Sequence, residues 1–166
     1  MPEAALSLGS NIGDKAANLQ AAIDALGDDP GVEIVRQSSF YETEPWGDVE
    51  QDWFMNACVL LRSALPPHEL LQLCQHIERA GGRVRHSDRP WGPRAIDIDV
   101  LFYGDVTLDD AALTLPHPRM LLRGFVMIPL AEIAPDHVFA EGTVAELAAR
   151  LPSGAIRTWK SALSER

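Results

Sequence analysis

The hydrophobic residues of this chain change their spacing along its length, from every second residue to every third or fourth. Alternating or β-rich stretches predict four strands, at residues 4–8, 32–41, 53–61 and 96–100. Helical spacing predicts a helix over residues 14–26 and another that begins at Pro67 and ends at Gly81 and Gly82. For the first helix, Asp14 is the expected N-cap and Gly27 the residue just past the end.

The predicted elements follow one another as strand, helix, strand, strand, helix and strand. This order is the split βαβ arrangement of ferredoxin-like folds. From residue 104 onwards the pattern predicts a hairpin, a Pro-His-Pro turn at 116–118 and helices near 127–133 and 143–151. We therefore expect an α+β protein with a ferredoxin-like βαββαβ core and a C-terminal hairpin and helices, formed by residues 1–166 as a single domain.

The last strand of that core carries two carboxylates on one face. In the run Ile-Asp-Ile-Asp-Val at 96–100, Asp97 and Asp99 point one way and the apolar residues point the other way. The two carboxylates repel each other unless a cation lies near them, and two Mg²⁺ ions roughly 3.5–4 Å apart could share their oxygens. The simpler alternative is that both aspartates form the solvent-exposed face of an edge strand.

The loop before this strand favours the metal–phosphate interpretation. Residues 79–94 contain five of the fourteen basic residues of a chain with a net charge of −10, namely Arg79, Arg83, Arg85, Arg89 and Arg94. Guanidinium groups bind phosphate oxygens in pairs, so this local positive charge would attract a small anionic ligand. The overall negative charge argues against binding along a nucleic-acid backbone.

Other motifs exclude several classes of protein. Lys15 and Lys160 lie outside any G-x-x-x-x-G-K-[ST] frame, so the chain is not a P-loop kinase, and its size and motifs exclude a protein kinase. Cys58 and Cys74 have no metal-binding spacing, and we expect them to be buried thiols in the reducing cytoplasm. No span approaches transmembrane length, so we expect no membrane partner.

Seven segments of the chain resemble the 6-hydroxymethyl-7,8-dihydropterin pyrophosphokinase family. They are residues 9–11, 41–47, 54–56, 83–85, 91–99, 116–117 and 123–125, and the block Trp-Gly-Pro-Arg-x-x-Asp-x-Asp at 91–99 is the most specific of them. Members of this family transfer pyrophosphate from ATP to the hydroxymethyl group of the pterin in folate biosynthesis and release AMP. The resemblance therefore implies an ATP-dependent pyrophosphokinase that uses two Mg²⁺ ions.

The resemblance also implies roles for individual residues. Asp97 and Asp99 would bind the two Mg²⁺ ions, and Asp97 would also contact the pterin. Arg83 and Arg94 would act with them as catalytic residues. The residues implied to bind ATP are Gln75, Glu78, Arg83, Arg85, Trp91, Arg94, Ile98, His117 and Arg123. Those implied to bind the pterin are Gly9, Thr43, Pro45, Trp46, Phe54, Asn56, Asp97 and Phe125.

The implied pterin residues suit the chemistry of that ligand. A pterin is a flat ring with an amide-like edge, so its site needs aromatic faces and hydrogen-bonding groups. Phe54 and Phe125 would stack on its two faces, and Asn56 would pair with its edge. Taken singly, each phenylalanine is more often a core residue, Asn56 more often caps a turn, and Glu78 is as often an exposed acid at the end of a helix.

Three positions depart from the family pattern. Pro90 separates Arg89 from Trp91, whereas the family pattern has an arginine directly before the tryptophan. His86 stands where a lysine is common, and Pro118 follows His117 where an aromatic residue can occur. These departures concern the phosphate and nucleotide contacts.

Two other functions remain open from the sequence. A nucleotidyltransferase with paired aspartates would also use two metals but would release pyrophosphate. A non-enzymatic RNA-binding module would need stacked aromatic residues and a basic sheet face. We expect the pyrophosphokinase function, with ATP and the pterin as small-molecule partners, no nucleic acid, and a cytoplasmic monomer as the acting form.

Overall fold

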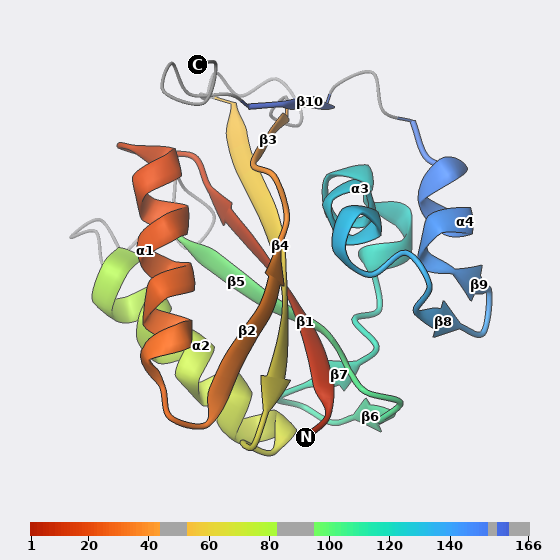
Figure 1. Ribbon diagram of the computed structural model, residues 1–166, viewed down its shortest axis with the longest axis horizontal. Helices are drawn as coiled ribbons and strands as arrows, with labels where there is room; N and C mark the ends of the chain where they lie inside the picture. Colours follow the sequence, from red (N-terminus) through yellow and green to blue (C-terminus); the bar gives the residue numbers. More distant parts are fainter. Residues whose placement is uncertain (44–52, 83–94, 153–155, 160–166) are drawn as a thin grey trace.

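A six-stranded sheet lies at the centre of the structure, a computed structural model that describes residues 1–43, 53–82, 95–152 and 156–159 (Figure 1). Its strands are β1 (Glu3–Ser10), β2 (Val32–Gln37), β3 (Tyr41–Thr43), β4 (Phe54–Ser63), β5 (Asp97–Tyr103) and β10 (Ile156–Thr158). They run in the order β10-β3-β4-β1-β5, and β2 also pairs with β4. All described pairs are antiparallel, and β1 lies between β4 and β5. This is the strand arrangement of a split βαβ core, so the predicted α+β ferredoxin-like fold is confirmed.

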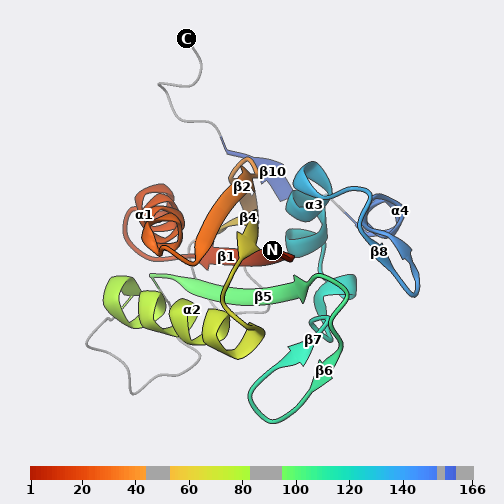
Figure 2. The same ribbon diagram turned by 60° about the horizontal axis from the view of Figure 1, so that its bottom comes forward.

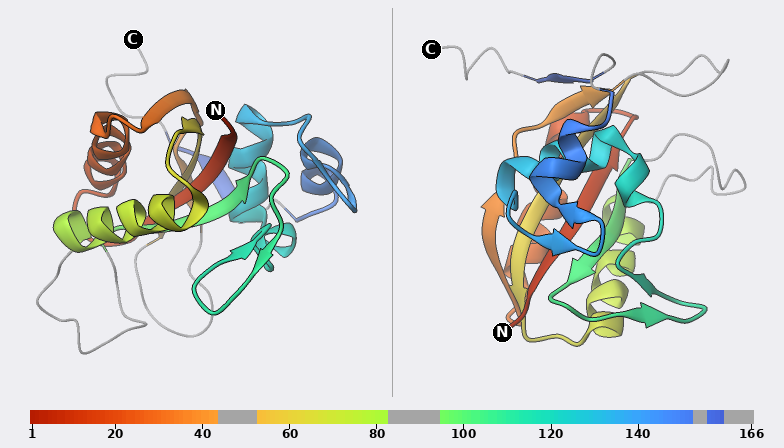
Figure 3. Two further views of the ribbon diagram at one scale, coloured as in Figure 1. Left: turned by 90° about the horizontal axis from the view of Figure 1, so that it is seen from below. Right: turned by 90° about the vertical axis from the view of Figure 1, so that its right-hand side faces the viewer.

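Two helices, α1 (Lys15–Asp28) and α2 (Pro67–Gly82), cover one face of this sheet (Figures 2 and 3). Asp14 caps α1 as predicted, since its side chain accepts a hydrogen bond from the backbone N–H of Ala17 at 3.1 Å. The predicted end of α1 is wrong, because the helix continues through Gly27 and ends only at Asp28. In contrast, α2 begins at Pro67 and ends at Gly82, as predicted.

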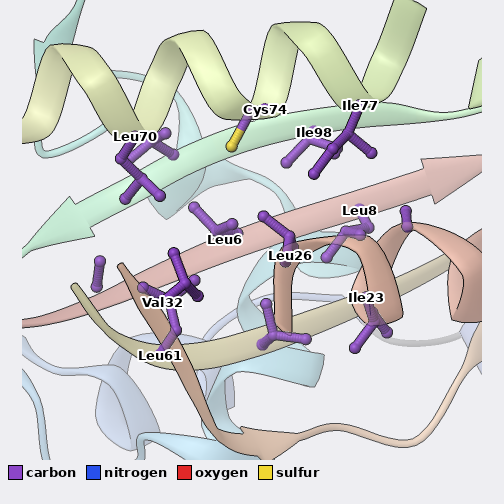
Figure 4. Close-up of a cluster of buried hydrophobic side chains, with 14 of the residues drawn as sticks. Leu6, Leu8, Ile23, Leu26, Val32, Leu61, Leu70, Cys74, Ile77 and Ile98 are labelled. Carbon is purple, nitrogen blue, oxygen red and sulfur yellow. The ribbon is translucent and has the colours of Figure 1, made fainter. Parts of the chain in front are cut away.

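The side chains between these helices and the sheet form the main hydrophobic core (Figure 4). Alternate residues of the central strands and one stripe of each helix supply it. Figure 4 shows Leu6 and Leu8 of β1, Leu61 of β4 and Ile98 of β5 facing Ile23, Leu26, Leu70, Cys74 and Ile77 of the helices. Because side chains of a strand alternate in direction, the neighbours of these strand residues face the opposite side of the sheet.

The opposite face carries the C-terminal elements. Helix α3 (Gly124–Ile133) packs on β4, and α4 (Val144–Ala149) packs on α3 (Figure 1). The remaining elements are the hairpin of β6 (Leu108–Asp109) and β7 (Thr114–Leu115), a short 3₁₀ helix (Met120–Leu122), and the hairpin of β8 (Val138–Phe139) and β9 (Gly142–Thr143). The predicted hairpin and both predicted helices are confirmed, although α3 begins earlier and α4 is shorter than the sequence pattern indicated.

The predicted strand over 32–41 is in fact two strands. Between β2 and β3, Ser38 donates its backbone N–H to the carbonyl of Cys58 at 2.9 Å, and its hydroxyl oxygen accepts from the N–H of Cys58 at 2.9 Å. This pairing redirects the chain so that β3 runs beside the start of β4, where Tyr41 lies opposite Asn56 and Thr43 opposite Phe54.

Both cysteines have free, buried thiols, as predicted. Burial raises the pKa of the Cys74 thiol to about 12, so this thiol is neutral at physiological pH. Within the described residues, no helix is long and apolar enough to span a membrane.

Candidate active site

A cavity of about 200 Å³ opens on the α3 side of the sheet, at the point where β1, β3, β4 and β5 approach the start of α3. Of the described residues, those that line it are Ser7, Gly9, Thr43, Phe54, Asn56, Asp97, Asp99, Arg123 and Phe125. Segments far apart in the sequence therefore meet around one space. All the described members of the predicted pterin set, and both predicted metal ligands, belong to this lining.

The register of the sheet places the acidic residues beside the predicted pterin residues. Gly9 of β1 lies opposite Asn56 on one side and opposite Asp97 on the other. Ser7, two residues earlier on the same face, lies opposite Asp99. Because residues directly opposite each other share a face of the sheet, Asp97, Gly9 and Asn56 form one row across three strands. The floor of the cavity is this row and its neighbours.

Gly9 leaves space for the side chain of Asn56. A Cβ atom at position 9 would lie only 2.9 Å from Oδ1 of Asn56, closer than such atoms approach in folded proteins. The side-chain amide of Asn56 is buried and donates a hydrogen bond from Nδ2 to Oγ1 of Thr43 at 2.9 Å. Asn56 is thus held between a glycine and a threonine, with its amide edge fixed in the cavity wall.

The aspartate strand has the two faces that its alternation predicts. Ile96, Ile98 and Val100 are buried in the main core, while Asp97 is half-buried and Asp99 is exposed on the cavity side. Of the described strands, β5 is the outermost on this side of the sheet, as the edge-strand alternative requires. Both aspartates nevertheless line the cavity together with Arg123, so they face a space that is partly cationic.

Three residues of the predicted nucleotide set lie near β5 but not in the cavity lining. Glu78 of α2 accepts a hydrogen bond at Oε2 from the backbone N–H of Ile98 at 2.8 Å. The side chain of Ile98 is buried in the main core, so any contact between this residue and a nucleotide has to use its backbone. Gln75, one turn earlier in α2, is exposed on the surface.

Arg123 brings positive charge to the other wall, and His117 lies near it. Arg123 is the N-cap of α3, and its guanidinium carbon lies 5.8 Å from the centroid of the Phe125 ring. His117 is half-buried, and its Nδ1 accepts a hydrogen bond from the N–H of Arg119 at 3.2 Å. Burial lowers the pKa of His117, and the charges of Arg123 and Arg119 lower it further, while Asp99 acts in the opposite direction. His117 is therefore neutral at pH 7 and lies within electrostatic reach of the cavity.

The remaining predicted site residues lie outside the described part of the chain. They are Pro45, Trp46, Arg83, Arg85, Trp91 and Arg94, and the departures Pro90 and His86 lie there as well. Conversely, Ser7 lines the cavity but was not predicted from the sequence. The signal that could have indicated it is the alternation of β1, because Ser7 precedes Gly9 by two residues and shares its face.

Comparison with known proteins identifies the family. The model of the 7,8-dihydro-6-hydroxymethylpterin-pyrophosphokinase (HPPK) family matches residues 5–135. The chain belongs to the HPPK family. It is 54% identical over 155 residues to the 2-amino-4-hydroxy-6-hydroxymethyldihydropteridine pyrophosphokinase of Methylorubrum extorquens, covering 93% of this chain and 97% of that protein. The Bacillus subtilis protein of the same name is 41% identical, with 93% of this chain and 89% of that protein covered.

Solved structures show the same fold. The chain matches a Plasmodium falciparum HPPK-DHPS crystal structure with a TM-score of 0.68 and 16% identity, covering 90% of this chain and 43% of that chain. An HPPK-DHPS structure in complex with substrates gives a TM-score of 0.71 at 14% identity, covering 89% of this chain and 43% of that chain. The chain therefore spans less than half the length of these solved chains, and at this identity the likeness concerns the fold alone.

Membership of the HPPK family confirms the function that the resemblance implied, an ATP-dependent pyrophosphokinase of folate biosynthesis. The nucleotidyltransferase and RNA-binding alternatives are thereby set aside. The matched residues end before α4 and β10, which follow at Val144–Ala149 and Ile156–Thr158.

Proposed function

We infer that the cavity between the sheet and α3 is the site where the pterin hydroxyl meets the phosphates of ATP. The observation that carries this proposal is the shared lining, in which the predicted pterin residues and both aspartates surround one space of about 200 Å³. The family function requires the two substrates to react side by side. A single cavity with a stacking part and an acidic part meets this requirement.

The pterin is assigned to the part of the cavity around Asn56. Phe54 and Phe125 come from β4 and α3, so they can stack on opposite faces of a flat ring. The amide of Asn56 offers Oδ1 as an acceptor and a second N–H as a donor, which suits the mixed donors and acceptors of a pterin edge. Gly9 and Thr43 keep that amide in place, and Pro45 and Trp46, outside the described residues, complete the proposed set.

The aspartates are suited to Mg²⁺. Both present hard carboxylate oxygens from one strand face into the cavity. Within the described ranges, no group of three or more His, Cys, Asp or Glu residues comes together as a metal cage. Mg²⁺ is commonly held by one or two carboxylates, with water and substrate phosphates as the other ligands, so Asp97 and Asp99 fit two such ions shared with ATP. When bound, these ions would neutralise phosphate charge and align the triphosphate.

The reaction requires positioning more than covalent chemistry by the protein. The pterin hydroxymethyl oxygen forms a bond to the β-phosphorus of ATP, the bond from that phosphorus to the α-phosphate oxygen breaks, and AMP leaves. Asp97 lies in the row of Gly9 and Asn56, so it stands where the pterin and phosphate parts of the cavity meet. Arg123 supplies positive charge at the opposite wall.

The other proposed nucleotide residues lie outside the cavity lining or outside the described residues. The first group is Gln75, Glu78, Ile98 and His117, and the second is Arg83, Arg85, Trp91 and Arg94. Arg83 and Arg94 are proposed to hold the transferred phosphates directly, whereas the two aspartates would hold them through Mg²⁺. We further propose that residues 1–166 act as one domain and as a cytoplasmic monomer, and the free, buried thiols suit a reducing cytoplasm.

An experiment on Asn56 tests the site. We expect Asn56→Ala to raise the KM for the pterin by about tenfold or more, because it removes hydrogen bonds to the ring edge, while the affinity for ATP stays nearly unchanged. Product analysis should still give AMP and the pterin diphosphate, with no ADP. Unchanged pterin KM in a folded Asn56→Ala protein would show that the pterin binds elsewhere.

A further inference from the structure

Strand β10 adds an outer strand to the sheet beside the pterin part of the cavity (Figure 1). It lies beyond the residues matched by the family model. Ile156 lies opposite Thr43, and Arg157 lies opposite Glu42. Since Thr43 lines the cavity and accepts the hydrogen bond from Asn56, β10 is one strand away from the proposed pterin site.

The two faces of β10 make different contacts. Ile156 faces α3, because a Cβ on Gly124 would lie 3.2 Å from its Cδ1 atom. Arg157, the next residue, therefore faces the opposite side of the sheet, where α1 lies. Its side chain is behind the cavity and does not line it.

On that rear face, Arg157 joins two segments that lead into the cavity. Its Nε lies 3.3 Å from Oε1 of Glu42, and its guanidinium carbon lies 4.1 Å from the centroid of the Trp53 ring. Glu42 directly precedes Thr43, and Trp53 directly precedes Phe54. One guanidinium thus holds together the residues adjacent to two members of the cavity lining.

The tie made by Arg157 supplements weak backbone pairing. β3 is three residues long and pairs with β4 through only three described positions. An exposed ion pair contributes little by itself, but here the same cation also lies over an indole face. The side chain of Arg157 is 61% exposed and that of Glu42 is 23% exposed, so the ion pair is open to solvent on the arginine side and the contact with the indole ring adds to it. Lys15 of α1 supports the same place, since its Nζ donates to the carbonyl of Trp53 at 2.8 Å.

We propose that Arg157 is a positioning residue for pterin binding, which acts by fixing β3 against the start of β4. The contacts of Arg157 keep Thr43 and Phe54 at the separation that the pterin requires. Because Thr43 accepts the hydrogen bond from Asn56, they also keep the amide of Asn56 oriented. This inference rests on the proposed pterin site and adds to it a residue that touches no substrate.

The strand itself does not depend on Arg157. At the end of β10, Trp159 donates its backbone N–H to the carbonyl of Phe40 at 2.8 Å, and the rings of the two residues stack with centroids 6.2 Å apart. Truncating Arg157 therefore leaves the pairing of β10 in place and removes only the tie between Glu42 and Trp53.

The chain offers a matched control at the other end of β4. Arg62 forms a cross-strand ion pair with Glu33 at 3.6 Å, with side chains 47% and 59% exposed. This pair also joins β4 to a neighbouring strand, β2, but away from the cavity. Arg62→Ala thus removes the same charge and a similar contact without affecting the residues next to Thr43 and Phe54.

The test is steady-state kinetics and separate titration of each substrate for Arg157→Ala, Arg157→Lys and Arg62→Ala. For Arg157→Ala we expect the KM and Kd for the pterin to rise about three- to tenfold, with kcat and the KM for ATP within about twofold of wild type. Arg157→Lys keeps a cation over the ring and should recover part of the loss. Arg62→Ala should match wild type.

Three results would overturn the proposal. The first is an unchanged pterin KM in Arg157→Ala, and the second is an equal change of that KM in Arg62→Ala. The third is an equal loss for both substrates in Arg157→Ala together with a fall in Tm. If Arg157→Ala does not fold, Glu42→Gln removes the same ion pair and carries the same expectation in a milder form. Asn56→Ala distinguishes failure of the proposed pterin site from failure of the role of Arg157. Unchanged pterin affinity in Asn56→Ala contradicts the site itself. Weaker pterin affinity in Asn56→Ala, with unchanged affinity in Arg157→Ala, contradicts only the role of Arg157.

Discussion

The carboxylate of Glu78 accepts a hydrogen bond from the backbone N–H of Ile98 at 2.8 Å. Ile98 lies between Asp97 and Asp99, and of the described strands its own, β5, is the outermost on that side of the sheet. Helix α2 thus provides the acceptor that a further strand would otherwise provide. The two aspartates are held on a strand that is fixed on one edge by β1 and on the other by a helix side chain.

Replacement of Glu78 should therefore loosen the aspartate strand. In Glu78→Ala the Ile98 N–H loses its acceptor in a partly buried place, at a cost of about 1–3 kcal/mol in unfolding free energy. We expect faster hydrogen exchange at the Ile98 amide and a lower kcat. Glu78→Gln keeps an acceptor oxygen and should lose much less. If the two variants are equally impaired and only the KM for ATP rises, the charge of Glu78 acts on the nucleotide and not on the strand.

Gly9→Ala should damage pterin binding more than folding. The new methyl group would lie 2.9 Å from Oδ1 of Asn56, so the amide has to rotate away and release Thr43. Overpacking of this kind costs about 1–3 kcal/mol, and we expect most of it to appear as weaker pterin affinity in calorimetric titration. Gly81→Ala is the control, since a Cβ there meets none of the described residues within 4 Å and alanine is the better helix former. Equal pterin affinities in the two variants would contradict the role given to Gly9.

Phe125→Ala should separate the two substrates. A ring that stacks on the pterin contributes about 0.5–1.5 kcal/mol beyond its buried area, so we expect the pterin Kd to rise by about tenfold while ATP binding is retained. Phe125 also packs against the buried hydrophobic residues on the α3 side of the sheet, among them Val126 and Met127. Phe125→Leu therefore serves as a control that keeps much of the volume but no ring. Equal losses for both ligands with a lower Tm would identify Phe125 as a core residue only.

Local patterns account for the parts of the fold and site that could be predicted. The alternation around Asp97 and Asp99 and the N-cap at Asp14 depend on residues a few positions apart, and the structure has both. The family motif added Gly9 and Asn56 to the same cavity, although neither residue shows a ligand-binding pattern by itself.

The features that could not be predicted depend on partners distant in the sequence. The break between β2 and β3 follows from hydrogen bonds between Ser38 and Cys58, twenty positions apart. The end of α1 is a local exception, since the helix passes through Gly27 and the N–H of Asp29 donates to the carbonyl of Leu26. Arg157 has no motif around it, and its contacts with Glu42 and Trp53 appear only once β10 is placed in the sheet.

His137 should make the stability of the protein depend on pH. Its ring stacks on Phe102, with centroids 3.6 Å apart and an interplanar angle of 4°, and it meets Phe139 edge-on. Burial lowers the pKa of His137, although Asp105 and Glu3 act in the opposite direction. The unfolded chain therefore binds a proton at His137 more readily than the folded protein does. The contribution of neutral His137 to the free energy of unfolding is fully present above the unfolded pKa of about 6.5, and it is lost as pH falls through the lower pKa of the folded state.

Thermal unfolding of wild type and His137→Phe as a function of pH checks this expectation. The variant keeps a ring against Phe102 but has no group that titrates, so its Tm should fall less between neutral pH and about pH 5. His117, whose pKa is also lowered, remains in both proteins and gives a common background. Parallel curves for the two proteins would show that His137 does not contribute.

Asp97→Asn and Asp99→Asn test the acidic part of the site. Asparagine keeps the shape and one oxygen at each position but removes the charge that attracts Mg²⁺, so turnover should fall on the order of 10²-fold or more. Without ligand, Tm should change little, because both side chains face the cavity and one like-charge repulsion is removed. ATP affinity should fall in Mg²⁺ and stay the same in EDTA.

Asp109→Asn, an exposed acid on β6 away from the cavity, is the matched control and should behave as wild type in all three measurements. It separates loss of a cavity carboxylate from a general change in the net charge of an acidic protein. The edge-strand alternative makes the opposite prediction for Asp97→Asn and Asp99→Asn. If the two aspartates only form the solvent-exposed face of β5, their replacement costs a little stability and no Mg²⁺-dependent turnover. Retained turnover in both Asp97→Asn and Asp99→Asn would therefore decide for that alternative and against the proposed metal site.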